Sequence, residues 1–514
     1  MQAQSPFRSR PPTTSRRRSW LVSTATVLAA VATTLVVPSS AVATPAPKVP
    51  TLTWTACGEG FECATATVPM RTGSTAKGKT TDLALIRIPA RDRTHRIGTL
   101  FVNGGLQAGN GIALLRQRTA PFAALADRFD VVGFDQRGQS NSSPTAHCMT
   151  YEQERVIEEP LPAYPTLADR PAKIAEAKAL TTACGRNTDP TLLRNMSSAD
   201  SAADLDLLRR AVGDDKLSYL GQSYGTVVGQ IYAARYPDKV RSMVLDAAID
   251  GREYVSDPLR FDRDQLAASE FALGRFLDWC EATPALCSFG NGDPARAFDA
   301  LVDKLERNRL ANPGRHDILT GGLLLTQAIG GLINSDAWPT FAAYLTAMDA
   351  QDVPTTELPT GPDDVTAQQL ANSCLDRDIP TDLRAHDRHF AAAAARSPHF
   401  GRVYGYGELK CALWPVRADD RFDGPWRYTG RTRALVIGVD GDPLAPLAWA
   451  RNVTETMGRA RLLSVTGDGH TAFGRNSACV DGAVTAYLTS GRLPDRGATC
   501  TLPAPTAPPA TSTP

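Results

Sequence analysis

A serine stands between two glycines at residues 221–225, which read Gly-Gln-Ser-Tyr-Gly. The short apolar run 217–220 precedes this pentapeptide, and the run 226–234, with helical character, follows it. On a strand–turn–helix unit the serine hydroxyl is lifted clear of the sheet, and small flanking residues let the strained turn form. The pattern predicts that Ser223 is the nucleophile of a hydrolase; the alternative is a chance match in a loop.

A serine nucleophile needs a general base and an acid that orients the base. Among the histidines, His470 alone lies beyond the second block of predicted strands, in a Gly-rich turn after a strand. The acid is expected after the strand ending at Val439, where Asp442 is favoured and Asp440 would bond its own turn. The chain order serine, acid, histidine is that of α/β-hydrolases. The remaining histidines are expected at the surface: His95, His147, His316, His386, His389 and His399.

An oxyanion hole needs two N–H donors directed at the developing negative charge. One is expected from Tyr224, the residue after the nucleophile. The other is expected from the Gly-rich turn after an early strand, at Gly105 or Leu106. The alternative role of this turn is only to reverse the chain.

Short apolar runs separated by amphipathic helices predict a mostly parallel central sheet with helices on both faces. Together with the order serine, acid, histidine, this sheet indicates an α/β-hydrolase fold. Between residues 251 and 423 the strand rhythm is lost and helical spacing dominates, for example at 262–279 and 323–349. Because strands resume afterwards, a helical lid inserted into one sheet is favoured over an independent helical domain. The predicted parts are a signal peptide at 1–43, core segments at 44–250 and 424–500, the lid at 251–423, and a disordered Pro/Thr-rich tail at 501–514.

The N-terminus predicts export from the cell. Arg16–Arg18 precede an apolar stretch that ends at the cleavage-like triplet 41–43, and a membrane anchor is the alternative. The ten cysteines fit an oxidising compartment. Their connectivity is not fixed by the sequence, but pairing of sequence neighbours gives Cys57–Cys63, Cys148–Cys184, Cys280–Cys287, Cys374–Cys411 and Cys479–Cys500.

The formal net charge of +1 gives no indication of a nucleic-acid partner. No C-x-x-C pair or His–Cys cluster is present, so a zinc site is disfavoured, and no cofactor is implied. We expect a monomer that acts on a peptide or a small ester and does not stay on a membrane after signal cleavage.

The chain resembles secreted actinobacterial tripeptidyl aminopeptidases, which are prolyl-aminopeptidase-like α/β-hydrolases with a TAP-like C-terminal region. The resemblance covers nearly all of the mature chain and implies Ser223 as nucleophile, Asp442 as acid and His470 as base. Its motifs are residues 129–138, 201–206, 221–225, 240–246, 442–443, 469–470, and Cys374 with 411–415.

The chain departs from the family pattern at the presumed oxyanion turn. Where the family has Asn-Pro-Gly-Gly-Pro-Gly-Gly, residues 103–109 read Asn-Gly-Gly-Leu-Gln-Ala-Gly, which introduces Leu106 and Gln107. A leucine in this turn costs free energy if its φ must be positive. Gln136 also stands where the family has a proline.

The resemblance favours a secreted serine exopeptidase that releases short peptides, such as tripeptides, from free N-termini through an acyl-enzyme. The lid would then admit only chain ends, and an acidic lid residue would pair with the substrate ammonium. Glu408 and Asp376 are candidates for that acid, against the alternative that both are solvated surface charges. Two other functions are a carboxylesterase acting on a secreted metabolite, and a catalytically impaired binding protein with an altered oxyanion turn.

Overall fold

The structure is a computed structural model that describes residues 47–71, 78–105, 111–158, 164–312, 314–315, 317–356, 360–361 and 363–506. Several sequence predictions lie outside these residues: the signal peptide at 1–43, Leu106 and Gln107 of the oxyanion turn, His316, and the end of the tail at 507–514.

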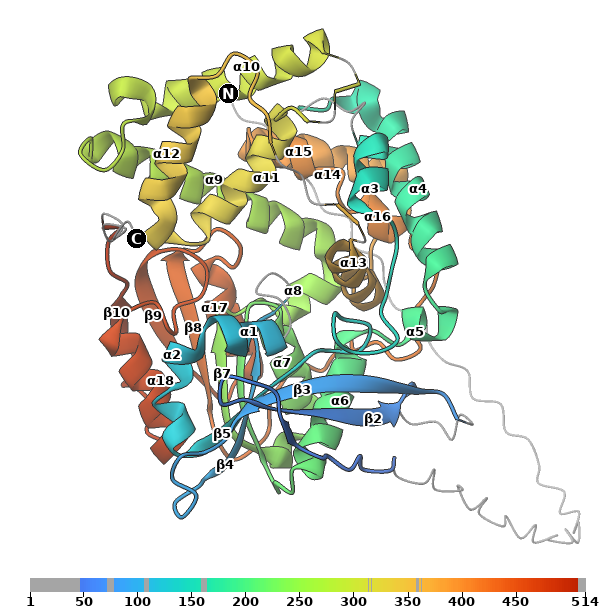
Figure 1. The fold of residues 1–514 in the computed structure, drawn as a ribbon, viewed down its shortest axis with the longest axis vertical. Helices are drawn as coiled ribbons and strands as arrows, with labels where there is room; N and C mark the ends of the chain where they lie inside the picture. The colour runs from blue at the N-terminus through green and yellow to red at the C-terminus, as the bar shows by residue number, and fades with distance from the viewer. Residues whose placement is uncertain are drawn as a thin grey trace, which may run out of the picture. The chain divides into compact units, whose positions relative to one another are not determined.

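The described residues form one ten-stranded sheet in the order β1-β2-β3-β5-β4-β6-β7-β8-β9-β10 (Figure 1). From β5 to β10 all neighbouring strands are parallel, while β1, β2, β3 and β5 pair antiparallel. The mostly parallel sheet predicted from the sequence is therefore confirmed. The strands are β1 Thr55–Ala56, β2 Glu62–Pro69, β3 Thr80–Ile88, β4 Gly98–Asn103, β5 Phe129–Phe134, β6 Leu217–Gln222, β7 Val240–Asp246, β8 Ala434–Gly441, β9 Ala460–Asp468 and β10 Thr499–Thr501.

Helices cover both faces of the sheet and bury its central strands. Every residue of β4, β5 and β6 is buried. Strands buried on both faces read as continuous apolar runs, which explains why the sequence revealed them. One face is covered by α6 Ser198–Ala211, α7 Gly225–Arg235 and α17 Leu447–Met457, and the other by α1 Gly111–Gln117 and α18 Ala478–Ser490.

The segment between β7 and β8 forms the helical layer at the carboxyl ends of the strands (Figure 1). It has its own apolar core, in which Phe276, Leu301, Leu324 and Trp338 are buried. Its helices are α8 Gly251–Ser256, α9 Pro258–Ala282, α10 Pro294–Ala311, α11 Gly321–Leu332, α12 Trp338–Asp349, α13 Asp364–Asp376, α14 Leu383–Arg396, α15 Phe400–Tyr404 and α16 Leu409–Ala412.

The helical stretch predicted at 323–349 consists of two helices rather than one. Helix α11 ends at Leu332, a short 3-10 turn at Ser335–Ala337 follows, and α12 begins at Trp338. Pro339 lies in the first turn of α12, where its missing N–H costs nothing. A proline inside a continuous helix would instead break the hydrogen-bond ladder.

Three helices that precede α6 also pack on the lid, although the sequence prediction placed them with the core. They are α3 Tyr151–Glu158, α4 Arg170–Asn187 and α5 Pro190–Arg194. Cys184 of α4 shares an apolar cluster with Ala371 of α13, and Ala177 shares another with Phe390 of α14. The lid layer is therefore built from two separate segments of the chain, α3–α5 and α8–α16.

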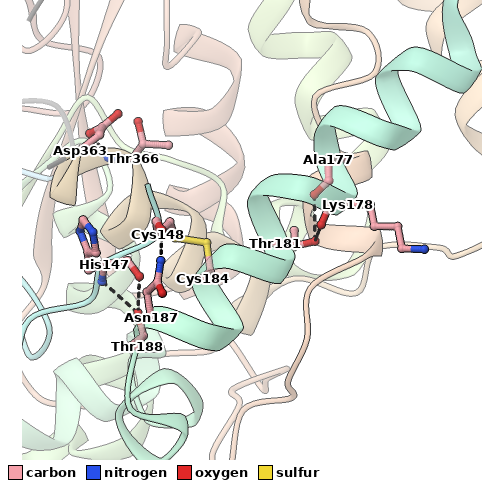
Figure 2. Close-up of a disulfide and its surroundings, with 10 residues drawn as sticks. All are labelled: His147, Cys148, Ala177, Lys178, Thr181, Cys184, Asn187, Thr188, Asp363 and Thr366. Carbon is pink, nitrogen blue, oxygen red and sulfur yellow. Dashed lines mark hydrogen bonds between the residues drawn. A yellow bond between two sulfur atoms is a disulfide. The ribbon is translucent and has the colours of Figure 1, made fainter. Parts of the chain in front are cut away.

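The Cys148–Cys184 disulfide ties the C-terminal end of α4 to the chain that follows β5 (Figure 2). Beside it, the Asn187 side chain donates to the Cys148 carbonyl at 2.6 Å. The Thr188 hydroxyl donates to the His147 carbonyl at 2.7 Å and accepts from the His147 N–H at 2.9 Å. All five disulfides of the structure join the sequence neighbours named above.

The predicted disordered tail begins too early in the sequence. Residues up to Thr501 form β10, and Leu502 is buried with its N–H bonded to the Thr466 carbonyl at 2.9 Å. The Cys479–Cys500 disulfide holds this strand beside α18. Among the described helices, none combines the length and apolarity needed to cross a lipid bilayer.

Candidate active site

Ser223 lies directly between β6 and α7, in a left-handed conformation with φ of 55°. In the fully described stretch 217–233, every residue except Ser223 is buried. The flanking glycines are required by close backbone contacts, because a Cβ added at Gly221 would lie 2.5 Å from the Gly225 carbonyl oxygen. One added at Gly225 would lie 2.6 Å from the Asn103 carbonyl oxygen. The local sequence therefore forces a strained turn that presents the serine hydroxyl.

Asp442 and His470 follow β8 and β9 and are bonded to each other. The Nδ1 atom of His470 lies 2.9 Å from each carboxylate oxygen of Asp442. The same carboxylate accepts from the Leu444 and Ala445 N–H groups at 2.8 and 2.9 Å, and Asp442 is 1% exposed. Backbone donors thus fix the carboxylate that fixes the imidazole.

Asp440, the alternative acid, is exposed and far less constrained. Its carboxylate accepts from the Gly467 N–H at 3.0 Å, on the neighbouring strand rather than in its own turn. The carboxylate that contacts His470 is that of Asp442.

The Nε2 atom of His470 is buried and has no hydrogen-bond partner among the described residues. The structure thus brings Asp442 and His470 together but does not form a hydrogen bond from Ser223 to the imidazole. Such bonds are often long or misaligned in unliganded enzymes and tighten when substrate binds.

The presumed oxyanion turn packs directly on the nucleophile. Gly105 has φ of 82°, and a Cβ added there would lie 2.9 Å from Cβ of Ser223 and 3.1 Å from the Tyr224 nitrogen. The Gly105 N–H already donates to the Asn103 side chain at 3.0 Å. The Gly105 N–H is therefore already engaged in this structure, and Leu106, the alternative donor, lies outside the described residues, so the second oxyanion donor stays a prediction.

Asp376, at the end of α13, reaches the residue that follows the nucleophile. Its carboxylate accepts from the Tyr224 hydroxyl at 3.1 Å and from the Ser198 N–H and hydroxyl at 2.8 and 2.5 Å. Burial raises the pKa of Asp376 to about 6. Asp376 is therefore not a solvated surface charge, and its hydrogen bonds are committed to the protein.

Glu408 is also buried, with its carboxylate bonded to Arg377 at 2.7 Å. The surface-charge interpretation is thus wrong for Glu408 as well. Two histidines expected at the surface, His386 and His389, are buried too, because they lie on the inner face of α14. There Nε2 of His386 contacts the Pro380 carbonyl, and that of His389 contacts Asp262, each at 2.7 Å.

Asp246 is a functional candidate that the sequence did not indicate. It ends β7 and is fully buried, and its carboxylate accepts from the Gln222 side chain and from the N–H groups of Ala472 and Phe473. Its carbonyl accepts from the Ser223 N–H at 2.9 Å. One residue thus joins the turn of the serine to the loop of the histidine.

Comparison with known proteins assigns the chain to a family. Residues 100–291 match the family model described as alpha/beta hydrolase fold, and residues 397–500 match the one described as TAP-like protein. Serine protease Hip1 of Mycobacterium bovis is 31% identical over 453 residues, which cover 82% of this chain and 84% of that protein. Carboxylesterase B of Mycobacterium tuberculosis is 30% identical over 499 residues, with coverage of 88% and 90%. Tripeptidyl aminopeptidase of Streptomyces lividans is 28% identical over 462 residues, with coverage of 86% and 83%. The chain therefore belongs to the TAP-like α/β-hydrolases and is a serine hydrolase.

Proposed function

We propose that the chain is an exopeptidase that releases short peptides, such as tripeptides, from free N-termini. The observation that carries the catalytic part is the imidazole of His470, which is bonded to the buried Asp442 and lies in a loop tied through Asp246 to Ser223. Relatives named as a tripeptidyl aminopeptidase and a serine protease support peptides as the substrate class.

In the proposed reaction, His470 removes the proton of the Ser223 hydroxyl through Nε2 as the oxygen attacks the substrate carbonyl. Asp442 orients the imidazole through Nδ1 and stabilises its charged form. The N–H groups of Tyr224 and of either Gly105 or Leu106 bind the oxyanion, and His470 then returns the proton to the leaving amine. Water, activated by the same imidazole, releases the acyl-enzyme.

A carboxylesterase is the second candidate, because a relative with that name is 30% identical over nearly the whole chain. Fold and catalytic residues serve either chemistry, so the substrate decides between them. The test is a panel of tripeptide anilides with free and blocked N-termini, beside simple aryl esters. Faster hydrolysis of the free peptides supports the exopeptidase. Equal rates on blocked peptides, or activity on esters alone, would contradict it.

The catalytic assignment has its own test in a fluorophosphonate probe, which reacts with activated serines. We expect labelling of the wild-type protein and none of Ser223→Ala. Ser142→Ala is a matched control, since this serine is buried and hydrogen-bonded outside the site. A folded wild-type protein that resists the probe would favour the impaired binding protein.

We further propose that the enzyme is exported and acts as a monomer. The basic and apolar N-terminal sequence and the five disulfides support export. The expected product in the culture medium begins at Thr44. Retention of the full-length chain in the cell pellet would contradict export, and a dimer mass in solution would contradict the monomer.

A further inference from the structure

The loop that carries His470 is bonded to the lid through the main chain. The His470 N–H donates to the carbonyl of Ile333, just after α11, at 2.9 Å. Two residues further along the lid, the Ser335 hydroxyl donates to the Asp468 carbonyl at 2.7 Å. The lid segment Ile333–Ser335 therefore contacts the backbone on either side of Gly469.

Arg475 closes this contact from the other side of the histidine loop. Its guanidinium donates to the Ile333 carbonyl at 3.1 Å and to the Ser335 hydroxyl at 3.3 Å. Asp336 lies 3.7 Å from its Nε atom. Arg475 is only 8% exposed, and an arginine is rarely buried unless it is paired. Its burial indicates that the lid segment and the histidine loop are held together as one unit.

The backbones approach so closely that the contact leaves little room for adjustment. Gly469 has φ of 110°, and a Cβ added there would lie 3.0 Å from the Ile333 carbonyl oxygen.

The loop that carries Asp442 is attached to the lid as well. In α9, Ser269 donates to the Pro443 carbonyl at 2.8 Å, and Gln265 donates to the Leu444 carbonyl at 2.9 Å.

We infer that the lid is part of the catalytic scaffold, in which Ser335 and Arg475 are positioning residues that hold the His470 loop. The inference rests on the proposed role of His470 as general base. Because the bonds of Ser335 and Arg475 join the lid to the His470 loop, their loss would lower the rate of the chemical step rather than substrate binding. The lid cannot lift at this edge without displacing the backbone that carries the imidazole.

The first test uses Ser335→Ala, which removes the hydroxyl bonds, and Arg475→Lys, whose ammonium lacks the planar fork that reaches both Ile333 and Ser335. Misplacement of a catalytic group by about 1 Å costs roughly 100-fold in rate, so we expect kcat to fall between about 10-fold and 100-fold with KM unchanged. Matched controls are Thr346→Ala, whose hydroxyl bonds within α12, and Arg309→Lys, whose guanidinium bonds to Glu306 within α10. Folded Ser335→Ala and Arg475→Lys proteins with the wild-type kcat would overturn the inference.

The second measurement is hydrogen exchange of the segment 466–475 without substrate, which separates this inference from the proposed function. We expect faster exchange in Ser335→Ala and Arg475→Lys than in the wild type and the two controls. Exchange at the wild-type rate would overturn the inference that Ser335 and Arg475 hold the His470 loop, even if Ser223 is the nucleophile. A wild-type protein that the fluorophosphonate probe does not label would contradict the function, while the exchange result would still decide whether the lid holds the loop.

Discussion

The backbone N–H of Ser223 donates to the carbonyl of Asp246 at 2.9 Å, so the nucleophile turn is fixed by the end of the neighbouring strand. The side chain of the same aspartate accepts from the N–H groups of Ala472 and Phe473, which closely follow His470. The two turns that Asp246 joins each contain a residue with positive φ: Ser223, at 55°, and Thr471, at 69°. Asp246 thus connects two strained turns, one of which presents Ser223, the proposed nucleophile, while the other directly follows His470, the proposed base.

Asp246→Asn tests this connection. Three N–H donors converge on the carboxylate, namely the side-chain amide of Gln222 and the backbone N–H groups of Ala472 and Phe473. An amide would turn its own NH2 toward a donor and leave a buried polar group unsatisfied, at a cost of about 1–3 kcal/mol. We expect the free energy of unfolding, measured in urea, to fall by about that amount, and kcat to fall at least about 10-fold. Asp440→Asn, at the exposed aspartate, is the control, and an Asp246→Asn protein with wild-type kcat would refute the role.

Gly105→Ala tests the contact between the oxyanion turn and the nucleophile. The new Cβ would lie 2.9 Å from Cβ of Ser223, in a backbone region that L-residues enter at a cost of about 1–2 kcal/mol. We expect slower fluorophosphonate labelling and a lower kcat because Ser223 is displaced. Gly213→Ala is a matched control for backbone strain alone, since Gly213 has φ of 81° and no atom within 4 Å of the added Cβ. Equal kcat values in the two variants would contradict the contact.

The sequence predicted Ser223, Asp442 and His470 because each belongs to a local pattern of strand, turn and neighbouring glycines. It could not predict the contacts of Asp246, Asp376 and Arg475, since their partners are Ala472, Tyr224 and Ile333, which are 226, 152 and 142 positions away. Such bonds depend on tertiary contacts that local periodicity does not encode. The sequence does not indicate strand β2 for another reason, because its residues ECATATVP include too few large apolar side chains to form a recognisable strand pattern.

Removal of Cys148–Cys184 is expected to cost more stability than removal of Cys57–Cys63. The first closes a loop of 36 residues and the second a loop of 6. In the chain-entropy model these loops correspond to about 4 and about 2 kcal/mol at 25 °C. Paired Cys→Ser variants, unfolded in urea, give the difference directly. An equal loss in both would indicate that folded-state contacts, such as the bond from Asn187 to the Cys148 carbonyl, outweigh the entropy of the unfolded chain.

The buried carboxyl of Asp376 should make the free energy of unfolding depend on pH. Burial raises the pKa of its carboxyl from 3.8 to about 6, so the folded protein binds the proton more tightly than the unfolded chain. The corresponding stabilisation, about 3 kcal/mol by linkage, is complete below about pH 4 and is lost as the pH rises through about 6. Asp376→Asn removes this titration, so the difference in unfolding free energy, wild type minus variant, should fall between pH 4 and 7. Asp378→Asn, at an aspartate whose side chain is 70% exposed, should show no such trend. A difference for Asp376→Asn that stays constant across this range would show that the carboxyl is ionised throughout, held by the Tyr224 and Ser198 hydroxyls despite its burial.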